Sequence, residues 1–168
     1  GFGQSPFSPP SIVIDALKDY ADCHDYLPVQ GYLQLREAAA SFYKTHSGLS
    51  FKSENVFIAN GSKQLIFNIM AIFEQADVIL CNPSWVSYEP QAKLIGHPVY
   101  RIDTSFDTKW HITPDSLRAT LTSRPDPSRP AILIFNSPGN PDGCVYSENQ
   151  LRDISEVCRE FGVLVISD

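Results

Sequence analysis

The sequence is poor in the features that mark membrane and nucleic-acid-binding proteins. Its longest apolar-rich run, residues 65–73, is interrupted by Asn68 and is far shorter than a bilayer span. The net charge is −6, and 13 Lys and Arg are scattered singly among 19 Asp and Glu. A nucleic-acid-binding protein usually carries a concentrated basic patch, which this chain lacks. These absences argue against a membrane or a nucleic acid as a partner.

Cysteine and histidine are few, and their spacing does not favour metal binding. The four cysteines contain no Cys-x-x-Cys pair and the four histidines no His-x-x-x-His pair, so no metal site is expected. The chain opens without Met and without a charged segment followed by an apolar one, so no signal peptide is expected within it. We therefore expect reduced, structural thiols and a cytoplasmic location.

The first part of the chain predicts an extended arm followed by two helices. Residues 1–10 contain three prolines and cannot form regular structure. Ser11 is in position to cap a short helix that runs to about residue 21. After a turn over 26–31, apolar and small residues recur at helical spacing from 32 to about 45, and Gly48 lies just past the end of this helix.

Beyond Gly48, short apolar runs alternate with amphipathic segments. The expected strands are 56–59, 78–81, 99–102, 131–135 and 163–166. The expected helices are 62–73, 87–96, 113–121 and 147–161. Nearly continuous apolar strands alternating with helices favour a mostly parallel sheet covered on both faces, which is an α/β architecture.

The loop at 136–143, Asn-Ser-Pro-Gly-Asn-Pro-Asp-Gly, is the most informative segment. It follows the apolar run 131–135, and its X-Pro steps and glycines fix an irregular loop at a strand's carboxyl end, where open α/β sheets place ligands. This loop resembles the Asn-Pro-x-Asn-Pro-x-Gly signature of the fold type I aminotransferases, which use pyridoxal 5′-phosphate (PLP). The resemblance implies a three-layer αβα fold with an N-terminal arm and short helix over 1–31 and a partial large domain over 32–168.

A second strand-to-helix turn contains Gly61, Ser62 and Lys63. Glycine permits close approach of a ligand, Ser62 is placed to cap the helix, and free N–H groups in a first helical turn favour a phosphate. An ordinary cap on a core helix accounts for the same residues. The resemblance implies that these three residues hold the cofactor phosphate.

Trp85 follows the next strand, in the segment Asn-Pro-Ser-Trp-Val-Ser-Tyr. A Trp at this place either covers the end of the sheet or offers a flat face on which a planar heterocycle stacks. The resemblance implies that Trp85 stacks on the pyridine ring. Tyr88 is interpreted as a helix-packing residue.

Asn140 and Asp168 carry the chemistry that the resemblance implies. Asn140 matches the second Asn of the family loop, which hydrogen-bonds the phenolic oxygen of PLP; an Asx-turn is the alternative. Asp168 follows the apolar run 163–166, where family members place the acid that pairs with the pyridine nitrogen; a helix cap is the alternative. A carboxylate there keeps the nitrogen protonated, because a nearby opposite charge raises the pKa of a base.

Two further matches lie in the N-terminal part. Tyr26 fits the family tyrosine that reaches across a dimer interface to the partner's phosphate, and Arg36 is interpreted as a helix-surface partner of a nearby carboxylate. Gly3 matches a position whose backbone N–H meets the substrate carboxylate. The resemblance therefore implies a homodimer.

The resemblance covers about the first half of such an enzyme. None of the six lysines has the family's Ser-x-x-Lys setting, so the Schiff-base lysine and the carboxylate-binding Arg are expected beyond Asp168, and these 168 residues alone are expected to be inactive. The implied reaction moves an amino group between an amino acid and a 2-oxo acid. A PLP-dependent lyase or decarboxylase of the same fold and a non-catalytic binding or assembly module are the alternatives.

Overall fold

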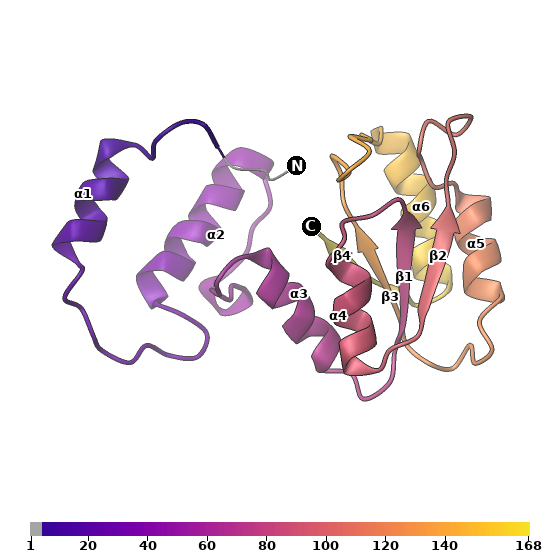
Figure 1. Ribbon diagram of the computed structural model, residues 1–168, viewed down its shortest axis with the longest axis horizontal. Helices are drawn as coiled ribbons and strands as arrows, with labels where there is room; N and C mark the ends of the chain where they lie inside the picture. The colour runs from indigo at the N-terminus through magenta and orange to yellow at the C-terminus, as the bar shows by residue number, and fades with distance from the viewer. Residues whose placement is uncertain (1–4) are drawn as a thin grey trace. The chain divides into compact units, whose positions relative to one another are not determined.

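The structure, a computed structural model, describes residues 5–168 in two compact units (Figure 1). The first unit ends at Ile58 and contains α1 (Ser11–Asp19), α2 (Leu33–Ser47) and the 3₁₀ helix η1 (Ser53–Asn55). The second unit, Ala59–Asp168, contains α3 (Ser62–Ala71), β1 (Asp77–Asn82), α4 (Tyr88–Ile95), β2 (Val99–Asp103), α5 (Pro114–Thr122), β3 (Ala131–Phe135), α6 (Glu148–Glu160) and β4 (Leu164–Ser167). Among the described residues, no helix combines the length and apolarity that crossing a membrane requires.

The first unit contains both predicted helices, but two predictions there, the Ser11 cap and the strand over 56–59, were wrong. Ser11 does not cap α1, because the N-cap is Pro10, Ser11 is already helical, and no side chain caps this end. Gly48 ends α2 in a left-handed conformation, as its position predicted. The predicted strand 56–59 does not form, because a strand needs a paired neighbour; here the Ile58 N–H donates a single hydrogen bond to the Gln30 carbonyl.

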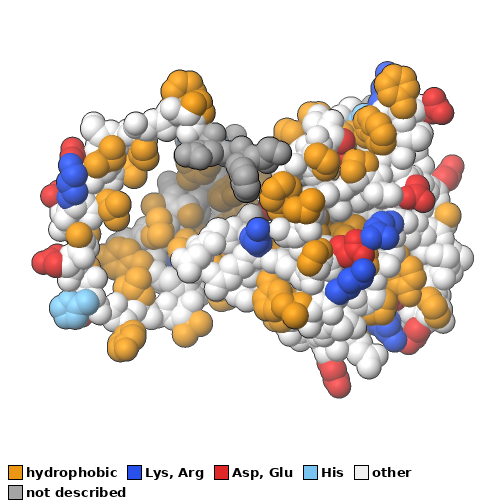
Figure 2. Space-filling view, in the orientation of Figure 1, with side chains coloured by type: hydrophobic (Ala, Val, Ile, Leu, Met, Phe, Trp, Pro, Cys, Tyr) orange, Lys and Arg blue, Asp and Glu red, His pale blue; other side chains and the backbone are white. Residues whose placement is uncertain are grey.

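Arg36 has a different role from the predicted one. Its side chain is buried, and it donates from Nε to the Gly31 carbonyl at 3.1 Å and from Nη1 to the Ser53 carbonyl at 3.0 Å. Its partners are backbone oxygens, so Arg36 fastens α2 to the two segments beside it. Hydrophobic side chains remain exposed over α1 and α2 (Figure 2), among them Ile12, Leu17 and Phe42.

The second unit has the predicted α/β architecture. Its four strands are parallel, in the order β2-β1-β3-β4, and four of the five expected strands appear within one or two residues of their predicted bounds. Helices α3 and α4 cover one face of the sheet, and α5 and α6 cover the other (Figure 1). The result is a three-layer αβα sandwich.

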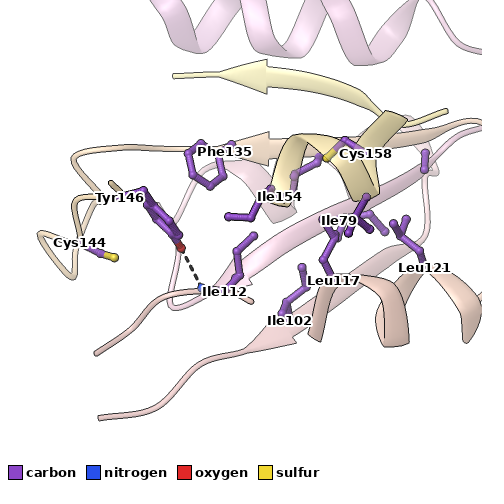
Figure 3. Packing of buried hydrophobic residues seen from close by; sticks show 13 residues of the cluster. Ile79, Ile102, Ile112, Leu117, Leu121, Phe135, Cys144, Tyr146, Ile154 and Cys158 are labelled. Atoms are coloured by element: carbon purple, nitrogen blue, oxygen red, sulfur yellow. Dashed lines mark hydrogen bonds between the residues drawn. The ribbon is translucent and has the colours of Figure 1, made fainter. Parts of the chain in front are cut away.

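Alternation along β1 divides the core between the two faces. Val78 and Leu80 pack with Ile66 and Met70 of α3, whereas Ile79 packs with the α5 and α6 side chains. These β1 side chains are at most 1% exposed because the central strand is covered on both faces. Figure 3 shows the α5 and α6 side of this core, with Ile79 close to Leu117 and Leu121.

Helices α5 and α6 begin where the sequence provides capping residues. Thr113 accepts a hydrogen bond from the Ser116 N–H, and Pro114 starts α5. Ser147 accepts from the Gln150 N–H, and the Gln150 side chain bonds back, which is a capping box. These local signals explain why the two helix starts match the prediction.

A buried ion-pair cluster closes the sheet at the amino end of β1. Asp77 is 1% exposed and lies 3.3 Å from Nη1 of Arg124 and 3.3 Å from Nη1 of Arg129. Arg124 is also buried and donates to the Leu121 and Arg129 carbonyls. A buried carboxylate requires such partners, so this cluster joins β1 to the segment between α5 and β3.

Candidate cofactor site

The sheet contains a topological switch point between β1 and β3. β1 leads into α4 on one face, whereas its neighbour β3 leads into α6 on the opposite face. The two connections leave the sheet in opposite directions, which opens a crevice at the carboxyl ends of these strands. Open α/β sheets bind ligands at such a crevice.

A small cavity lies in this crevice. It is lined by residues at the carboxyl ends of β1 and β3 and in the segments that follow β1, β2 and β3: Cys81, Pro83, Ser84, Tyr88, Trp110, Ile134, Asn136, Gly139, Asn140, Asp142, Cys144 and Tyr146. Its free volume is about 20 Å³, enough for one water molecule. A larger ligand therefore has to lie across its rim, where Asn140 is exposed.

Asp168 is held at the end of β4 by three hydrogen bonds. Its N–H donates to the Phe135 carbonyl at 3.0 Å, and its own carbonyl accepts from Nδ2 of Asn136 at 2.6 Å. Its carboxylate Oδ2 accepts from the Tyr88 hydroxyl at 2.5 Å. The backbone and the carboxylate of Asp168 are therefore both fixed.

The sequence predicted that Tyr88 only packs α4 against the sheet, but the structure gives it a second role. It is 2% exposed and its hydroxyl reaches across the crevice to Asp168. Burial and the neighbouring Asp168 carboxylate both raise the pKa of Tyr88, so the phenol remains protonated and donates. Spacing along the sequence gave no sign of this contact, because 80 residues separate the two.

Asn136 is a second residue that sequence reasoning missed. Its Nδ2 holds the Asp168 carbonyl, while its Oδ1 is buried and has no hydrogen-bond partner. Asn136 also lines the cavity. A buried amide oxygen without a donor is uncommon in native proteins and here marks a place for a donor from a ligand or water.

The first turn of α3 has the predicted open N-terminus. Gly61 has φ 88°, a left-handed conformation that favours glycine, and it is the N-cap residue. Ser62 does not cap the helix: it is already helical, and no side chain caps this end. The first-turn N–H groups of Ser62 and Lys63 therefore remain without a side-chain cap.

Trp85 and Lys63 lie close together beside the crevice. The Lys63 ammonium is 5.9 Å from the centroid of the Trp85 ring, and the Lys63 carbonyl accepts from Nε2 of Gln91. Trp85 is half-buried against the core, and it lines an open groove next to the small cavity rather than the cavity itself. The predicted phosphate turn and the predicted stacking residue are therefore neighbours.

A charged cluster borders the same groove. Glu89 pairs with Lys93 at 2.7 Å and with Arg101. Hydrogen bonds from these two cations lower the pKa of Glu89. Among the described residues that line this groove, Glu89 is the only acid, and both cations pair with it, so these residues offer an anion no unpaired carboxylate.

Two thiols line the cavity in protonated form. Burial raises the pKa of Cys81 to about 12, and the nearby Asp142 and Cys144 add to the shift. Burial also raises the pKa of Cys144, with a further contribution from Asp142. Neither thiol is therefore activated as a nucleophile.

The two remaining predicted site residues are in the N-terminal part of the chain. The Tyr26 side chain is fully exposed in the first unit. Gly3 lies outside the described residues. The structure thus brings Asn140 into the lining of one crevice and Asp168 into contact with its lining residues Tyr88 and Asn136, while Lys63 and Trp85 lie at its side.

The fold defines an open α/β protein with a crevice at its switch point, the place where proteins of this architecture bind ligands. The model of the family described as "Aminotransferase class I and II" matches residues 1–168. The chain belongs to this family, and its fold is that of the fold type I enzymes.

Curated relatives match the whole chain but extend well beyond it. The aspartate aminotransferase of Bacillus subtilis (strain 168) is 30% identical over all of this chain and 42% of its own length. That of Geobacillus stearothermophilus is 33% identical with the same coverage. This chain thus spans about two fifths of the length of these relatives.

Solved structures agree with this assignment. A Thermus thermophilus aspartate aminotransferase, determined with maleate, has a TM-score of 0.89 and 29% identity over 99% of this chain and 44% of its own. An aromatic aminotransferase from Pyrococcus horikoshii OT3 has a TM-score of 0.87 and 27% identity over 100% of this chain and 45% of its own.

Proposed function

We propose that the complete natural protein is a PLP-dependent aminotransferase that moves an amino group between an amino acid and a 2-oxo acid. The observation that carries this proposal is the placement of Asp168 at the end of β4, fixed by Tyr88 and Asn136, beside a crevice whose rim bears Asn140. Family membership supports it, as do the aminotransferase names of the relatives.

The residues present fit PLP. The cofactor has a phosphate, a planar ring, a phenolic oxygen and a ring nitrogen, and each has a matching group on this chain. The uncapped first turn of α3 suits the phosphate, and the Trp85 face suits the ring. The unpartnered Oδ1 of Asn136 further marks the crevice as a place where a polar ligand or its water belongs.

We assign one role to each of the predicted residues. The backbone N–H groups of Gly61, Ser62 and Lys63 hold the phosphate, and Trp85 stacks on the ring. The amide of Asn140 donates to the phenolic oxygen, and Asp168 accepts from the protonated ring nitrogen. We propose further that the Gly3 N–H meets the substrate carboxylate.

Bound PLP supplies an electron sink that stabilises negative charge at the substrate α-carbon. Asp168 serves this chemistry by holding a proton on the ring nitrogen, because its carboxylate stabilises the adjacent positive charge. Tyr88 and Asn136 keep Asp168 in place, which maintains this charge pairing. Trp85 and Asn140 fix the plane and the rotation of the ring relative to Asp168.

We also propose a cytoplasmic homodimer whose subunits share active sites, with residues 1–31 as the arm and 32–168 as part of the large domain. Tyr26, fully exposed in this chain, supports the shared site, because an aromatic hydroxyl on an arm can reach a partner's phosphate. The free cysteines suit a reducing compartment. In the complete protein, Tyr26→Phe should weaken PLP binding and leave the dimer intact.

The proposed function is tested on the complete natural protein with its bound PLP quantified. We expect amino transfer from an amino acid to a 2-oxo acid, lost in Asp168→Asn while PLP is retained. A panel of amino donors, assayed also for decarboxylation and elimination, separates transfer from the other reactions of this fold. Absence of PLP binding, or PLP binding with only lyase or decarboxylase activity, would refute the proposal.

A further inference from the structure

The loop that carries Asn140 is closed on itself. We call this segment, residues 136–147, the Asn140 loop. The Gly139 N–H donates to the Cys144 carbonyl at 2.8 Å, and the Gly143 N–H donates to the Gly139 carbonyl at 2.9 Å. The Asp142 carboxylate accepts from the Cys144 N–H at 2.7 Å. It lies so close to Gly139 that a Cβ there would overlap it. Asn140 therefore belongs to one compact turn.

The base of this turn is fastened to the loop between β2 and α5, residues 104–113, here called the β2–α5 loop. Nε2 of His111 lies 3.0 Å from the Val145 carbonyl. The Tyr146 hydroxyl accepts from the Ile112 N–H at 2.9 Å, a contact drawn in Figure 3. The His111 and Tyr146 rings also meet edge to face, with centroids 4.6 Å apart. Three contacts thus join the two loops immediately after the turn closes.

Both ring nitrogens of His111 face backbone carbonyl oxygens. A carbonyl oxygen only accepts, so a hydrogen bond to it forms only from a ring nitrogen that carries the proton. Nε2 faces the Val145 carbonyl, and Nδ1 lies 3.2 Å from the Thr108 carbonyl. The tautomer protonated at Nε2 keeps the bond between the two loops, whereas the bond to Thr108 lies within the β2–α5 loop alone.

Two residues of the β2–α5 loop have an unfavourable backbone conformation. Lys109 and Trp110 both have left-handed backbone angles, φ 52° and 62°, which residues other than glycine rarely adopt. Hydrogen bonds from their N–H groups to the Phe106 and Ser105 carbonyls hold this geometry. It places Trp110 in the lining of the cavity that Asn140 and Asp142 also line. Such strain persists only where surrounding contacts enforce it, and it is found at functional sites.

We propose that the β2–α5 loop positions Asn140 for its ligand, and that His111 is the positioning residue that transmits this restraint through Val145. The proposal rests on the proposed role of Asn140 as donor to the cofactor's phenolic oxygen. It assigns to His111, Trp110 and Tyr146 a function beyond packing, because they determine where the Asn140 amide stands before the cofactor arrives.

A matched pair of variants tests this in the complete natural protein. In His111→Gln the side-chain amide can reach the Val145 carbonyl as Nε2 does, whereas in His111→Asn it reaches only the Thr108 side. We expect PLP affinity, measured by titration of the cofactor-free protein, to fall between about twofold and tenfold in His111→Asn. We expect His111→Gln to remain within twofold of wild type. Hydrogen exchange of the Gly139 and Gly143 amides without cofactor should be faster in His111→Asn alone.

A double-mutant cycle with Asn140→Ala shows whether His111 acts through Asn140. If it does, His111→Asn has no further effect on PLP affinity in the Asn140→Ala background. An equal effect in both backgrounds, or equal affinity losses in the Gln and Asn variants, overturns the proposal. If His111→Asn does not fold, His111→Phe, which keeps the ring against Tyr146 and loses both hydrogen bonds, takes its place in the cycle.

The outcomes also separate this proposal from the proposed function. If Asn140→Ala binds PLP as wild type does, the proposed cofactor role of Asn140 is refuted, and so is the proposed positioning by His111. If Asn140→Ala weakens PLP binding and His111→Asn does not, only the positioning proposal is refuted. Amino transfer by the wild-type protein is unaffected by either result.

Discussion

The Tyr88 hydroxyl donates a hydrogen bond of 2.5 Å to the carboxylate of Asp168, although 80 residues separate the two along the chain. Tyr88 begins α4 after β1, and Asp168 follows β4, with β3 between these strands in the sheet. The two side chains meet because the carboxyl ends of parallel strands share one edge. This contact fixes the orientation of the Asp168 carboxylate.

Removing the Tyr88 hydroxyl should lower the reaction rate more than it lowers the affinity for PLP. In the complete protein, we expect Tyr88→Phe to keep PLP and lower the single-turnover rate at least about tenfold, because a hydrogen bond to a charged group contributes about 1.5 to 3 kcal/mol. The rate is measured with bound PLP quantified. Tyr100→Phe, on edge strand β2, is the control and should react as wild type does. An unchanged rate in Tyr88→Phe would show that the contact is only structural.

Asp168→Asn should lower the single-turnover rate more than Tyr88→Phe does, while PLP stays bound. The amide preserves shape but carries no charge to keep the ring nitrogen protonated, so a loss of several kcal/mol would slow α-proton removal at least about a hundredfold. Asp168→Glu should be intermediate, because the charge remains but its position changes. A single-turnover rate in Asp168→Asn within about threefold of wild type, roughly 0.7 kcal/mol, would reduce Asp168 to a structural residue.

Trp85→Ala should weaken PLP binding by about 2- to 13-fold, which corresponds to an aromatic stacking contribution of about 0.5 to 1.5 kcal/mol. Trp85→Phe should retain most of the affinity, because it preserves a flat face. Val86→Ala is the control, since Val86 is exposed on the same segment. Equilibrium titration with PLP is the measurement, and equal affinity in Trp85→Ala and wild type would remove Trp85 from the site.

The ion pairs at the base of the sheet should contribute to stability alone. Arg124→Met leaves the buried Asp77 with one cation, and we expect it to lower the free energy of unfolding by about 3 to 5 kcal/mol. Arg118→Met removes an exposed partner of Glu160 and should change little. Urea unfolding compares the two variants. Equal stability of both would show that burial of the Asp77 cluster adds nothing.

The thiols of the second unit should resist alkylation in the native protein. Burial raises the pKa of Cys81 from 9.0 to about 12 and also raises the pKa of Cys144 and Cys158, so all three stay protonated at pH 8. Iodoacetamide should modify them only after unfolding in urea. Because the unfolded chain loses these protons first, the thiols should also reduce stability as the pH rises above about 9. Rapid labelling of Cys81 in the native protein at pH 8 would contradict this.

The sequence determined the elements whose signals are local. Apolar runs and capping residues predicted β3 over Ala131–Phe135 and the starts of α5 and α6, because apolar runs, proline and cap chemistry act within a few residues. The loop around Asn140 was recognisable for the same reason. The prediction failed for residues 56–59, which are apolar enough for a strand but pair with no strand among the described residues. The predicted caps Ser11 and Ser62 were also wrong, because each lies one residue inside its helix.

Only the tertiary structure decided which residues share the site. The order β2-β1-β3-β4 brings the ends of β1, β3 and β4 to one edge, so Tyr88, Asn136 and Asp168 meet from three separate segments. Likewise, His111 reaches Val145 because the connections after β2 and β3 end at that same edge. No spacing along the chain encodes these contacts, because sheet order is set by the packing of helices on both faces and not by any single segment.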